Sequence, residues 1–368
     1  MINFAVGPVP MDDSIRSLGS EDVPYFRTAE FSKIMLENED CLLKLANAPS
    51  GSRAVFLTAS GTGAMEATVM NCLDPIADRA IVVDGGSFGR RFRDMLELHG
   101  IEHDAIVLKH GDALTENDLR PYDGGGYTAF LVNLGETSQG ILYDADMIAD
   151  FCSRNDLFLI VDGISSFLAD PFDMKSIGAD VLITDAQKAI ACPPGVAPVV
   201  LSPDALRRIE TIRQPCMYLS YRAALDNQKR GQTPYTPAVG ILLQINKRLQ
   251  EIIRRGGAES EIDRCHEIAS DFRIRIEAEG LPFVPRLNSP SNAVTYLVSK
   301  GFPVGETVRL LKEEYGIWVC PNGGDEGIDA FRVGHIGRHT VEENKVLISA
   351  LVDLRSRGYM DGLESDCA

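Results

Sequence analysis

Apolar and polar positions along the chain fall into two alternating kinds of segment. Short runs rich in Val, Ile and Leu begin at residues 54, 80, 129, 157, 180 and 197. Such runs are typical of strands buried on both faces of a sheet. Between several of them, helical periodicity covers 63–73, 89–100 and 144–155, and the last two segments end at Gly100 and Asn155, as helix stop signals predict. The alternation predicts an α/β fold with a mostly parallel sheet.

The pattern changes near residue 240. Residues 240–280 have nearly continuous helical periodicity, which Gly256 and Gly257 interrupt, and shorter strands and helices follow. We therefore expect a large domain over 16–240 and a smaller α+β domain formed by 1–15 and 241–368. A long connecting helix is expected to join the two domains.

Polar or glycine-rich residues follow each of the first five apolar runs. They are Ser60-Gly61-Thr62, Asp84-Gly85-Gly86, Gly135-Glu136-Thr137, Asp162-Gly163 and Gln187-Lys188. Ligands of open α/β sheets bind outside the carboxyl ends of the strands, so we expect these residues to face one crevice.

A lysine at the end of a buried strand needs a chemical reason, because lysine is almost never fully buried unless its charge is paired or used. Lys188 offers an amine that attacks carbonyls once its pKa is lowered, and Asp162 offers a carboxylate for a protonated ring nitrogen. This is the pair that lets pyridoxal phosphate act as an electron sink. The small residues from Ser60 to Thr62 offer a phosphate site at a helix N-terminus, although Asp162, Ser60 and Thr62 could each simply cap a helix. A dinucleotide fingerprint is excluded, because Glu66 stands where a third glycine is required.

Charge and composition narrow the choice of partner. A net charge of −17 argues against binding to nucleic acid or to an anionic membrane. No apolar run is long enough to span a bilayer and no leader pattern opens the chain, so we expect a cytoplasmic protein. Eight cysteines without a CxxC pair indicate reduced core thiols. His335 and His339 lack a third ligand nearby, so no metal site is expected.

Seven motifs, in order and spacing, resemble the class V aminotransferase group of fold-type I pyridoxal-phosphate enzymes. The motifs are SGTGAMEA, DGGSFGRRF, NLGETSQGIL, LIVDGISSF, GADVLITDAQKAIACPPG, QTPYTPAVGILLQI and FRVGHIG. Within that group, the chain looks like the alanine-glyoxylate, serine-pyruvate and 2-aminoethylphosphonate-pyruvate aminotransferases. The resemblance implies a seven-stranded sheet between helices, pyridoxal 5'-phosphate as cofactor, and a homodimer with composite active sites.

The resemblance also implies a role for each matched residue. Lys188 bonds the cofactor covalently and shuttles the proton, Asp162 pairs with the pyridine nitrogen, and Arg332 clamps the substrate carboxylate with its planar fork. The other implied cofactor contacts are Ser60, Gly61, Thr62 and Gln187 on the phosphate, Thr137 at the ring hydroxyl or ring edge, and Phe88 stacked on the ring in place of the family's usual tryptophan. A hydroxyl of Tyr235 or Thr236, with Thr233 a third possibility, reaches the phosphate of the neighbouring subunit.

Three functions fit these residues. The first is transfer of an amino group from a small amino acid or aminoalkylphosphonate to a small 2-oxo acid such as pyruvate or glyoxylate. The second is a lyase resembling cysteine desulfurase, which would use a mobile-loop thiol, but Cys320 follows an apolar run and is typical of a buried strand end. The third is a non-catalytic cofactor-binding module, against which the intact Lys188, Asp162 and Arg332 argue. The donor stays open, and the arginines available for a phosphonate are Arg27, Arg90, Arg91 and Arg338.

Overall fold

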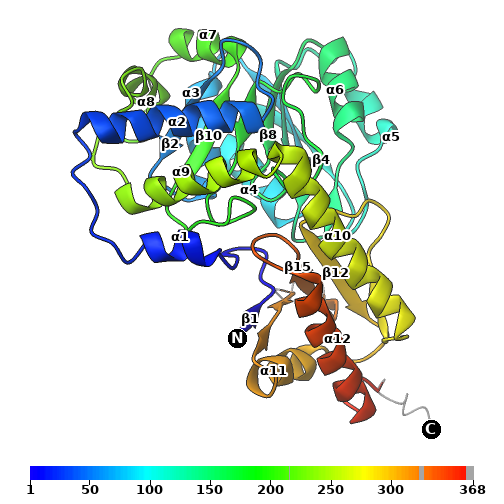
Figure 1. Ribbon diagram of the computed structural model, residues 1–368. Coiled ribbons are helices and arrows are strands. Elements are labelled where there is room, and N and C mark those ends of the chain that lie inside the picture. Colours follow the sequence, from blue (N-terminus) through cyan, green and yellow to red (C-terminus); the bar gives the residue numbers. More distant parts are fainter. Residues whose placement is uncertain (215, 323–326, 362–368) are drawn as a thin grey trace.

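A seven-stranded sheet forms the centre of the computed structural model, which describes residues 1–214, 216–322 and 327–361 (Figure 1). Its strands, in spatial order, are β2 (Arg53–Leu57), β10 (Ala197–Leu201), β9 (Val181–Ile183), β8 (Phe158–Asp162), β5 (Ala129–Asn133), β3 (Arg79–Asp84) and β4 (Glu102–Val107). β10 is antiparallel to both of its neighbours, and the other paired strands are parallel. The expected mostly parallel sheet is therefore confirmed. All six apolar runs form strands of it.

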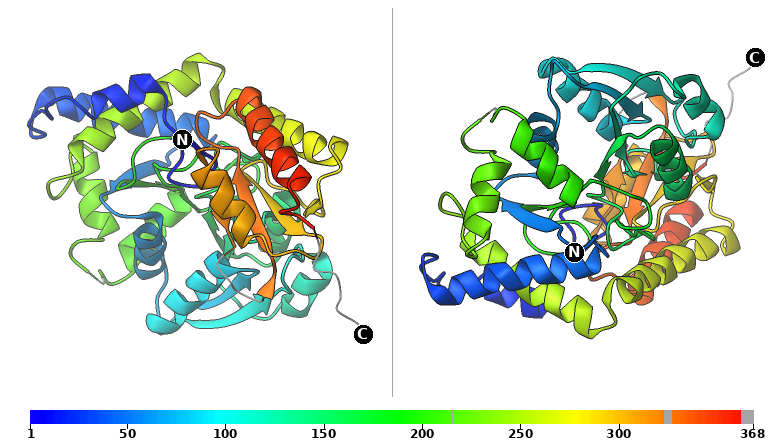
Figure 2. Two further views of the ribbon diagram at one scale, coloured as in Figure 1. Left: turned by 90° about the horizontal axis from the view of Figure 1, so that it is seen from below. Right: turned by 90° about the horizontal axis from the view of Figure 1, so that it is seen from above.

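Helices cover both faces of this sheet, because alternate side chains of each strand point to opposite faces. One core cluster joins Phe56, Ile81 and Val161 to α2 (Ala29–Leu45), α6 (Ala145–Arg154) and α9 (Val239–Arg254). The second cluster joins Val55, Val82 and Ile160 to α3 (Gly61–Cys72), α4 (Ser87–Leu98), α7 (Pro203–Thr211) and α8 (Tyr221–Gln228). Figure 2 shows these two helical layers from opposite sides. The shorter elements of this part are α1 (Asp13–Leu18), α5 (Glu116–Leu119), the 3-10 helix η1 (Arg120–Tyr122), and the hairpin of β6 (Gly135–Glu136) with β7 (Ile141–Leu142).

The C-terminal part of the chain builds a second, antiparallel sheet with its own core. Its strands, in order, are β11 (Phe283–Pro285), β12 (Val294–Ser299), β15 (Ala330–Gly334) and β14 (Cys320–Pro321). The helices are α10 (Gly257–Ala278), α11 (Gly305–Glu313) and α12 (Val341–Ser356). Phe4 enters this core, and β1 (Ile2–Asn3) pairs in parallel with β13 (Ile317–Trp318). Residues 2–4 thus lie with the smaller sheet, where Figure 1 shows β1, whereas Val9 and Ile15 belong to the core of the large sheet.

The expected break in the long helical stretch is confirmed. α9 ends at Arg254, Gly256 has a φ of +120°, and α10 begins at Gly257. α9 packs against α2 and contributes Leu242 and Ile245 to the core of the large sheet. The division of the chain into domains at residue 240 stays a prediction.

The remaining expectations concern cysteines, metals and membranes. The seven cysteines within the described ranges are all free and five of them are buried, whereas Cys367 lies outside those ranges. His335 shares a 2.7 Å hydrogen bond with Thr295, and His339 lies 3.1 Å from a carboxylate oxygen of Glu343. In the part of the chain that the structure describes, no group of three or more His, Cys, Asp or Glu is arranged to hold a metal ion, and no helix is long and apolar enough to cross a membrane.

Candidate active site

Lys188 lies in the turn that follows β9, and its side chain is half-buried. Its Nζ donates a hydrogen bond of 2.8 Å to the carbonyl oxygen of Val6. Burial lowers the pKa of Lys188, although the carboxylates of Asp185 and Asp162 oppose that shift. A lysine amine with a lowered pKa spends more time neutral, and the neutral amine is the form that attacks carbonyls.

Gly7 brings the N-terminal segment into close contact with this amine. Its φ is +135°, and a Cβ added to it would lie 2.7 Å from Nζ of Lys188. Two residues later, the N–H of Val9 donates to the carbonyl oxygen of Gln187 at 3.2 Å. Only glycine permits both this conformation and this approach, so the segment covers Lys188 directly. The sequence alone did not single out Gly7, because its neighbour is distant along the chain.

Asp162 ends β8 beside Asn133, its partner in the register of β5. Asn133 Nδ2 donates to Oδ2 of Asp162 at 3.0 Å, and the N–H of Ile164 donates to Oδ1 at 2.8 Å. Burial raises the pKa of Asp162 to about 6, while these hydrogen bonds and Lys188 oppose the shift. A buried carboxylate in this setting gains from a nearby cationic N–H group, such as a protonated ring nitrogen.

The expected phosphate residues surround the N-terminus of α3. Ser60 caps the helix, since its Oγ accepts a 3.3 Å hydrogen bond from the N–H of Gly63. The N–H of Gly61 donates to Oδ2 of Asp185 at 2.7 Å, and Gln187 Nε2 donates to the same oxygen at 2.6 Å. The structure therefore brings Ser60, Gly61 and Gln187 together. It adds Asp185, a carboxylate to which the sequence pattern assigned no role.

Thr62 and Phe88 both contact the side chain of Arg91. Nη1 of Arg91 donates to Oγ1 of Thr62 at 2.7 Å, and its guanidinium carbon lies 5.0 Å from the centroid of the Phe88 ring. The Phe88 side chain is half-buried in the first turn of α4. Arg91 thus supplies positive charge beside the candidate phosphate residues, an effect favourable to an anion.

Arg332 projects from β15 toward the end of the large sheet. Its Nη1 and Nη2 each make a long contact of 3.4 Å, to the carbonyl oxygens of Thr137 and Pro321. Its Nε is buried and without a partner among the described residues. A guanidinium held this loosely keeps its planar fork available for a carboxylate. Thr137 itself is buried, directly after Glu136, whose carboxylate accepts a 3.1 Å hydrogen bond from the N–H of Gly89 at the start of α4.

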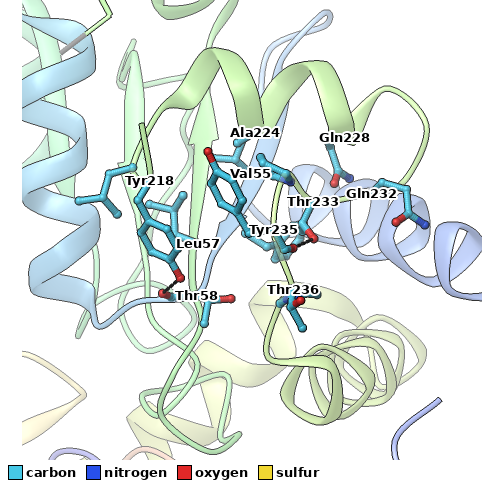
Figure 3. Close-up of a pocket in the computed structure, with 14 residues that line it drawn as sticks. Val55, Leu57, Thr58, Tyr218, Ala224, Gln228, Gln232, Thr233, Tyr235 and Thr236 are labelled. Atoms are coloured by element: carbon cyan, nitrogen blue, oxygen red, sulfur yellow. Dashed lines mark hydrogen bonds between the residues drawn. The ribbon is translucent and has the colours of Figure 1, made fainter. Parts of the chain in front are cut away.

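Tyr235 and Thr236 lie on a loop beside the end of β2, where a cavity is lined by residues of both segments (Figure 3). The ring of Tyr235 stacks on that of Tyr218 with centroids 5.6 Å apart. The N–H of Ala238 donates to Oγ1 of Thr58 at 3.2 Å, which fixes the loop to the strand end. Within the described residues, neither Tyr235 nor Thr236 hydrogen-bonds to Lys188 or Gln187 of its own chain.

The other candidate arginines and Cys320 have different surroundings. Arg27 braces the loop by donating to the carbonyl oxygens of Thr233 at 2.7 Å and Pro234 at 3.1 Å. Arg90 and Arg338 are exposed. Cys320 is half-buried in β14, directly opposite Arg332 in the strand register. Cys320 thus lies in a paired strand, but the expectation that it is buried was wrong, because β14 is a short strand with a single neighbour in its sheet.

The donor set fits a planar cofactor with a phosphate arm. A buried carboxylate, a covered lysine and an aromatic ring are present for the ring, and helix N–H groups with a nearby arginine are present for the phosphate. Gln187 Oε1 and Asn133 Oδ1 are buried and have no partner within the described ranges. Among the described residues, the carboxylate of Asp185 opposes an anion at this position, because it accepts from Gly61 and Gln187.

Comparison with known proteins agrees with this site. Residues 24–321 match the family Aminotransferase class-V. The chain is 29% identical over 357 residues to an uncharacterized aminotransferase of Helicobacter pylori strain J99, covering 95% of this chain and 93% of that protein. It is 29% identical over 350 residues to L-aspartate–glyoxylate aminotransferase of Paracoccus denitrificans, covering 92% and 86%. The crystal structure of a subgroup IV aspartate aminotransferase from Thermus thermophilus shares the fold, with a TM-score of 0.89, 24% identity, and coverage of 97% and 99%. The chain belongs to the class V aminotransferases and is a pyridoxal-phosphate-dependent enzyme of fold type I.

Proposed function

We propose that this enzyme moves an amino group from a small amino acid to glyoxylate or pyruvate. The observation that carries the proposal is the combination of a covered amine, a buried carboxylate and a loosely held guanidinium: Lys188 follows β9 beneath Val6, Asp162 ends β8, and Arg332 reaches from β15 to the carbonyl oxygen of Thr137. Bound pyridoxal phosphate would supply an electron sink for the bonds at the substrate Cα. Lys188 holds the cofactor and moves a proton at that carbon, and Asp162 keeps the ring nitrogen protonated.

The remaining residues of the site bind and orient the substrate and the cofactor. Arg332 takes the α-carboxylate that the amino donor and the 2-oxo acceptor have in common, and its Nε, which has no partner among the described residues, supports this role. The other proposed contacts are Phe88 on the ring face, Thr137 at the ring edge, and Ser60, Gly61, Thr62 and Gln187 on the phosphate. Together they fix the reacting atoms relative to Lys188.

Two features favour a small donor that has a carboxylate. The close approach of Gly7 to Nζ of Lys188 limits the room beside the amine. Of the four arginines available for a phosphonate, Arg27 and Arg91 already hydrogen-bond within the protein, and the other two are exposed. The aspartate–glyoxylate activity in the name of the Paracoccus denitrificans relative is consistent with this substrate class.

A half-reaction screen tests the proposal. The purified holoenzyme is mixed in turn with alanine, serine, aspartate, phosphoserine, 2-aminoethylphosphonate and cysteine, while the visible absorbance of the bound cofactor is followed. We expect alanine, serine or aspartate to abolish that absorbance and glyoxylate or pyruvate to restore it. Release of sulfide from cysteine, with no requirement for a 2-oxo acid, would instead indicate a lyase.

Borohydride labelling tests the lysine in the same preparation. Reduction should fix the cofactor on the peptide that contains Lys188, and Lys188→Ala should bind the cofactor reversibly without turnover. A label mapped to another lysine would refute this part of the proposal.

We further propose a homodimer in which Tyr235 or Thr236 reaches the cofactor phosphate in the second subunit. The exposed position of Thr236 and the stacking of Tyr235 on Tyr218 support this arrangement. A two-fold interface would place each loop at the other subunit's site.

Mixed refolding tests the composite site. Lys188→Ala is refolded with a Tyr235→Phe/Thr236→Ala chain, and random pairing should restore about a quarter of the sites in the sample. The matched control pairs Lys188→Ala with Asp162→Asn, whose lesions would spoil both sites of a mixed dimer. Equal recovery in the two mixtures, or full activity of dilute monomers, would overturn the composite site.

A further inference from the structure

The carboxylate of Asp185 occupies the donors that a cofactor phosphate would use. Oδ2 accepts hydrogen bonds from the N–H of Gly61 at 2.7 Å and from Nε2 of Gln187 at 2.6 Å. Oδ1 accepts a third, of 3.0 Å, from the N–H of Ala186. Two of these three donors belong to the proposed phosphate site.

The surrounding residues hold this carboxylate firmly. Asp185 is only 2% exposed, and a Cβ added to Gly61 would lie 2.7 Å from its Oδ2. Glycine at the first position of α3 therefore lets the helix N-terminus close onto the carboxylate. Asp185 also precedes Lys188 by a single turn, and the N–H of Lys188 donates to the backbone carbonyl of Asp185 at 3.3 Å. The carboxylate is thus built into the turn that positions the lysine.

A phosphate dianion and this carboxylate cannot both take the same donors at full charge. Like charges within a few ångströms repel, and the repulsion is strongest where water is excluded. When phosphate binds, the carboxylate must give up Gly61 and Gln187 or take up a proton. Burial raises the pKa of Asp185, which brings proton uptake closer to neutral pH. The repulsion, or the proton uptake that relieves it, costs free energy that a neutral side chain at this position would not cost.

We propose that Asp185 is a positioning residue that accepts from the phosphate-binding donors in the cofactor-free protein and weakens binding of the cofactor phosphate in the loaded enzyme. This inference rests on the proposed function, because it needs the cofactor phosphate at the N-terminus of α3. Its consequence is an enzyme whose cofactor exchanges readily and whose empty site stays satisfied, since Gly61 and Gln187 keep an acceptor in both states.

Two ligands that differ only in the phosphate isolate the effect. Dissociation constants of pyridoxamine 5'-phosphate and of pyridoxamine are measured by equilibrium dialysis, at one pH, for the wild-type chain and for Asp185→Asn. Neither ligand carries the aldehyde through which Lys188 would bond it. We expect Asp185→Asn to bind pyridoxamine 5'-phosphate about tenfold more tightly, on the usual scale of a like-charge contact. Its affinity for pyridoxamine should be unchanged.

Two further variants make the result decisive. Asp180→Asn is the matched control, because Asp180 is a half-buried carboxylate directly before β9 that accepts 2.9 Å hydrogen bonds from Leu159 N and Ser202 Oγ. It should leave both affinities unchanged. Asp185→Ser removes the charge with a smaller side chain and should also tighten phosphate binding. This second variant keeps the test available if Asp185→Asn does not fold.

Failure of the Asp185 inference and failure of the proposed cofactor site give different results. Unchanged or weaker binding of pyridoxamine 5'-phosphate by both Asp185 variants would overturn the inference. An equal gain for both ligands would do the same, because the effect would then lie at the ring. A wild-type chain that binds neither ligand would refute the cofactor site itself.

Discussion

Replacing Asp162 with asparagine should stabilise the cofactor-free protein at neutral pH while it impairs catalysis. Asp162 is only 1% exposed, and burial raises its pKa from 3.8 to about 6. An asparagine can keep both hydrogen bonds, because its Oδ1 can accept from the N–H of Ile164. The amide of Asn133 can turn so that its partnerless Oδ1 accepts from the new NH2 group. After that turn, Nδ2 of Asn133 stands where its oxygen had no partner among the described residues, so the substitution removes a buried charge without adding to the number of unsatisfied polar groups.

The size and sign of the effect follow from the pKa shift. Because the pKa of Asp162 is raised in the folded state, the protonated form stabilises the fold. That stabilisation is complete below about pH 4 and is lost as the pH rises through about 6. A shift of about two pKa units corresponds to about 3 kcal/mol. Relative to wild type, Asp162→Asn should gain little at pH 4 and up to about 3 kcal/mol at pH 8.

Chemical denaturation of cofactor-free protein, at a fixed protein concentration and at several pH values from 4 to 8, measures this gain. Asp170→Asn provides a comparison outside the site, because burial likewise raises the pKa of Asp170 to about 6. It should show the same pH trend and keep its transamination rate, whereas Asp162→Asn should lose turnover. A gain for Asp162→Asn that is constant from pH 4 to 8, or that shrinks as the pH rises, would refute the reasoning.

Two further predictions concern the cover over Lys188 and the carboxylate clamp. Gly7→Ala should lower turnover strongly, because the new methyl group would overlap the Lys188 side chain. The control Gly100→Ala, at a φ of +69° in open space, should cost about 1 kcal/mol of stability and leave kcat unchanged. Equal kcat values for the two variants would contradict this account. Arg332→Lys should raise KM for the 2-oxo acid at least about tenfold, because the ammonium cannot replace the planar fork, and steady-state kinetics showing an unaltered KM would exclude the clamp.

Apolar patterning predicted six strands of the sheet and missed the edge strand β4. The six runs that became strands are buried on both faces, so their sequences are almost uniformly apolar. β4 lacks this apolar pattern, because Glu102–Val107 forms an edge strand whose side chains are mostly accessible to water. A strand with one neighbour and little burial carries a weak signal.

The residues of the site could be predicted where a charged side chain directly follows an apolar run. Lys188 and Asp162 stand at the ends of apolar runs, and a charge in such a place needs a partner. Asn133, Gly7 and Asp185 were not assigned roles, because each acts through a residue that only folding brings near. Asp185 is the clearest case, since nothing in the turn from Thr184 to Lys188 indicates that its acceptor oxygen meets Gly61.

The pairing of β1 with β13 bears on the order in which the enzyme assembles. Ile2 aligns with Ile317, and the carbonyl oxygen of Phe4 accepts a 2.8 Å hydrogen bond from the N–H of Gly334. During synthesis, the segment that covers Lys188 therefore has to wait for partners made almost a full chain length later. Contacts of such sequence separation form late, because closing so long a loop costs entropy before any contact compensates for it. The large sheet and its lysine can be complete while this cover is still open, which leaves an interval in which a cofactor can enter an uncovered site.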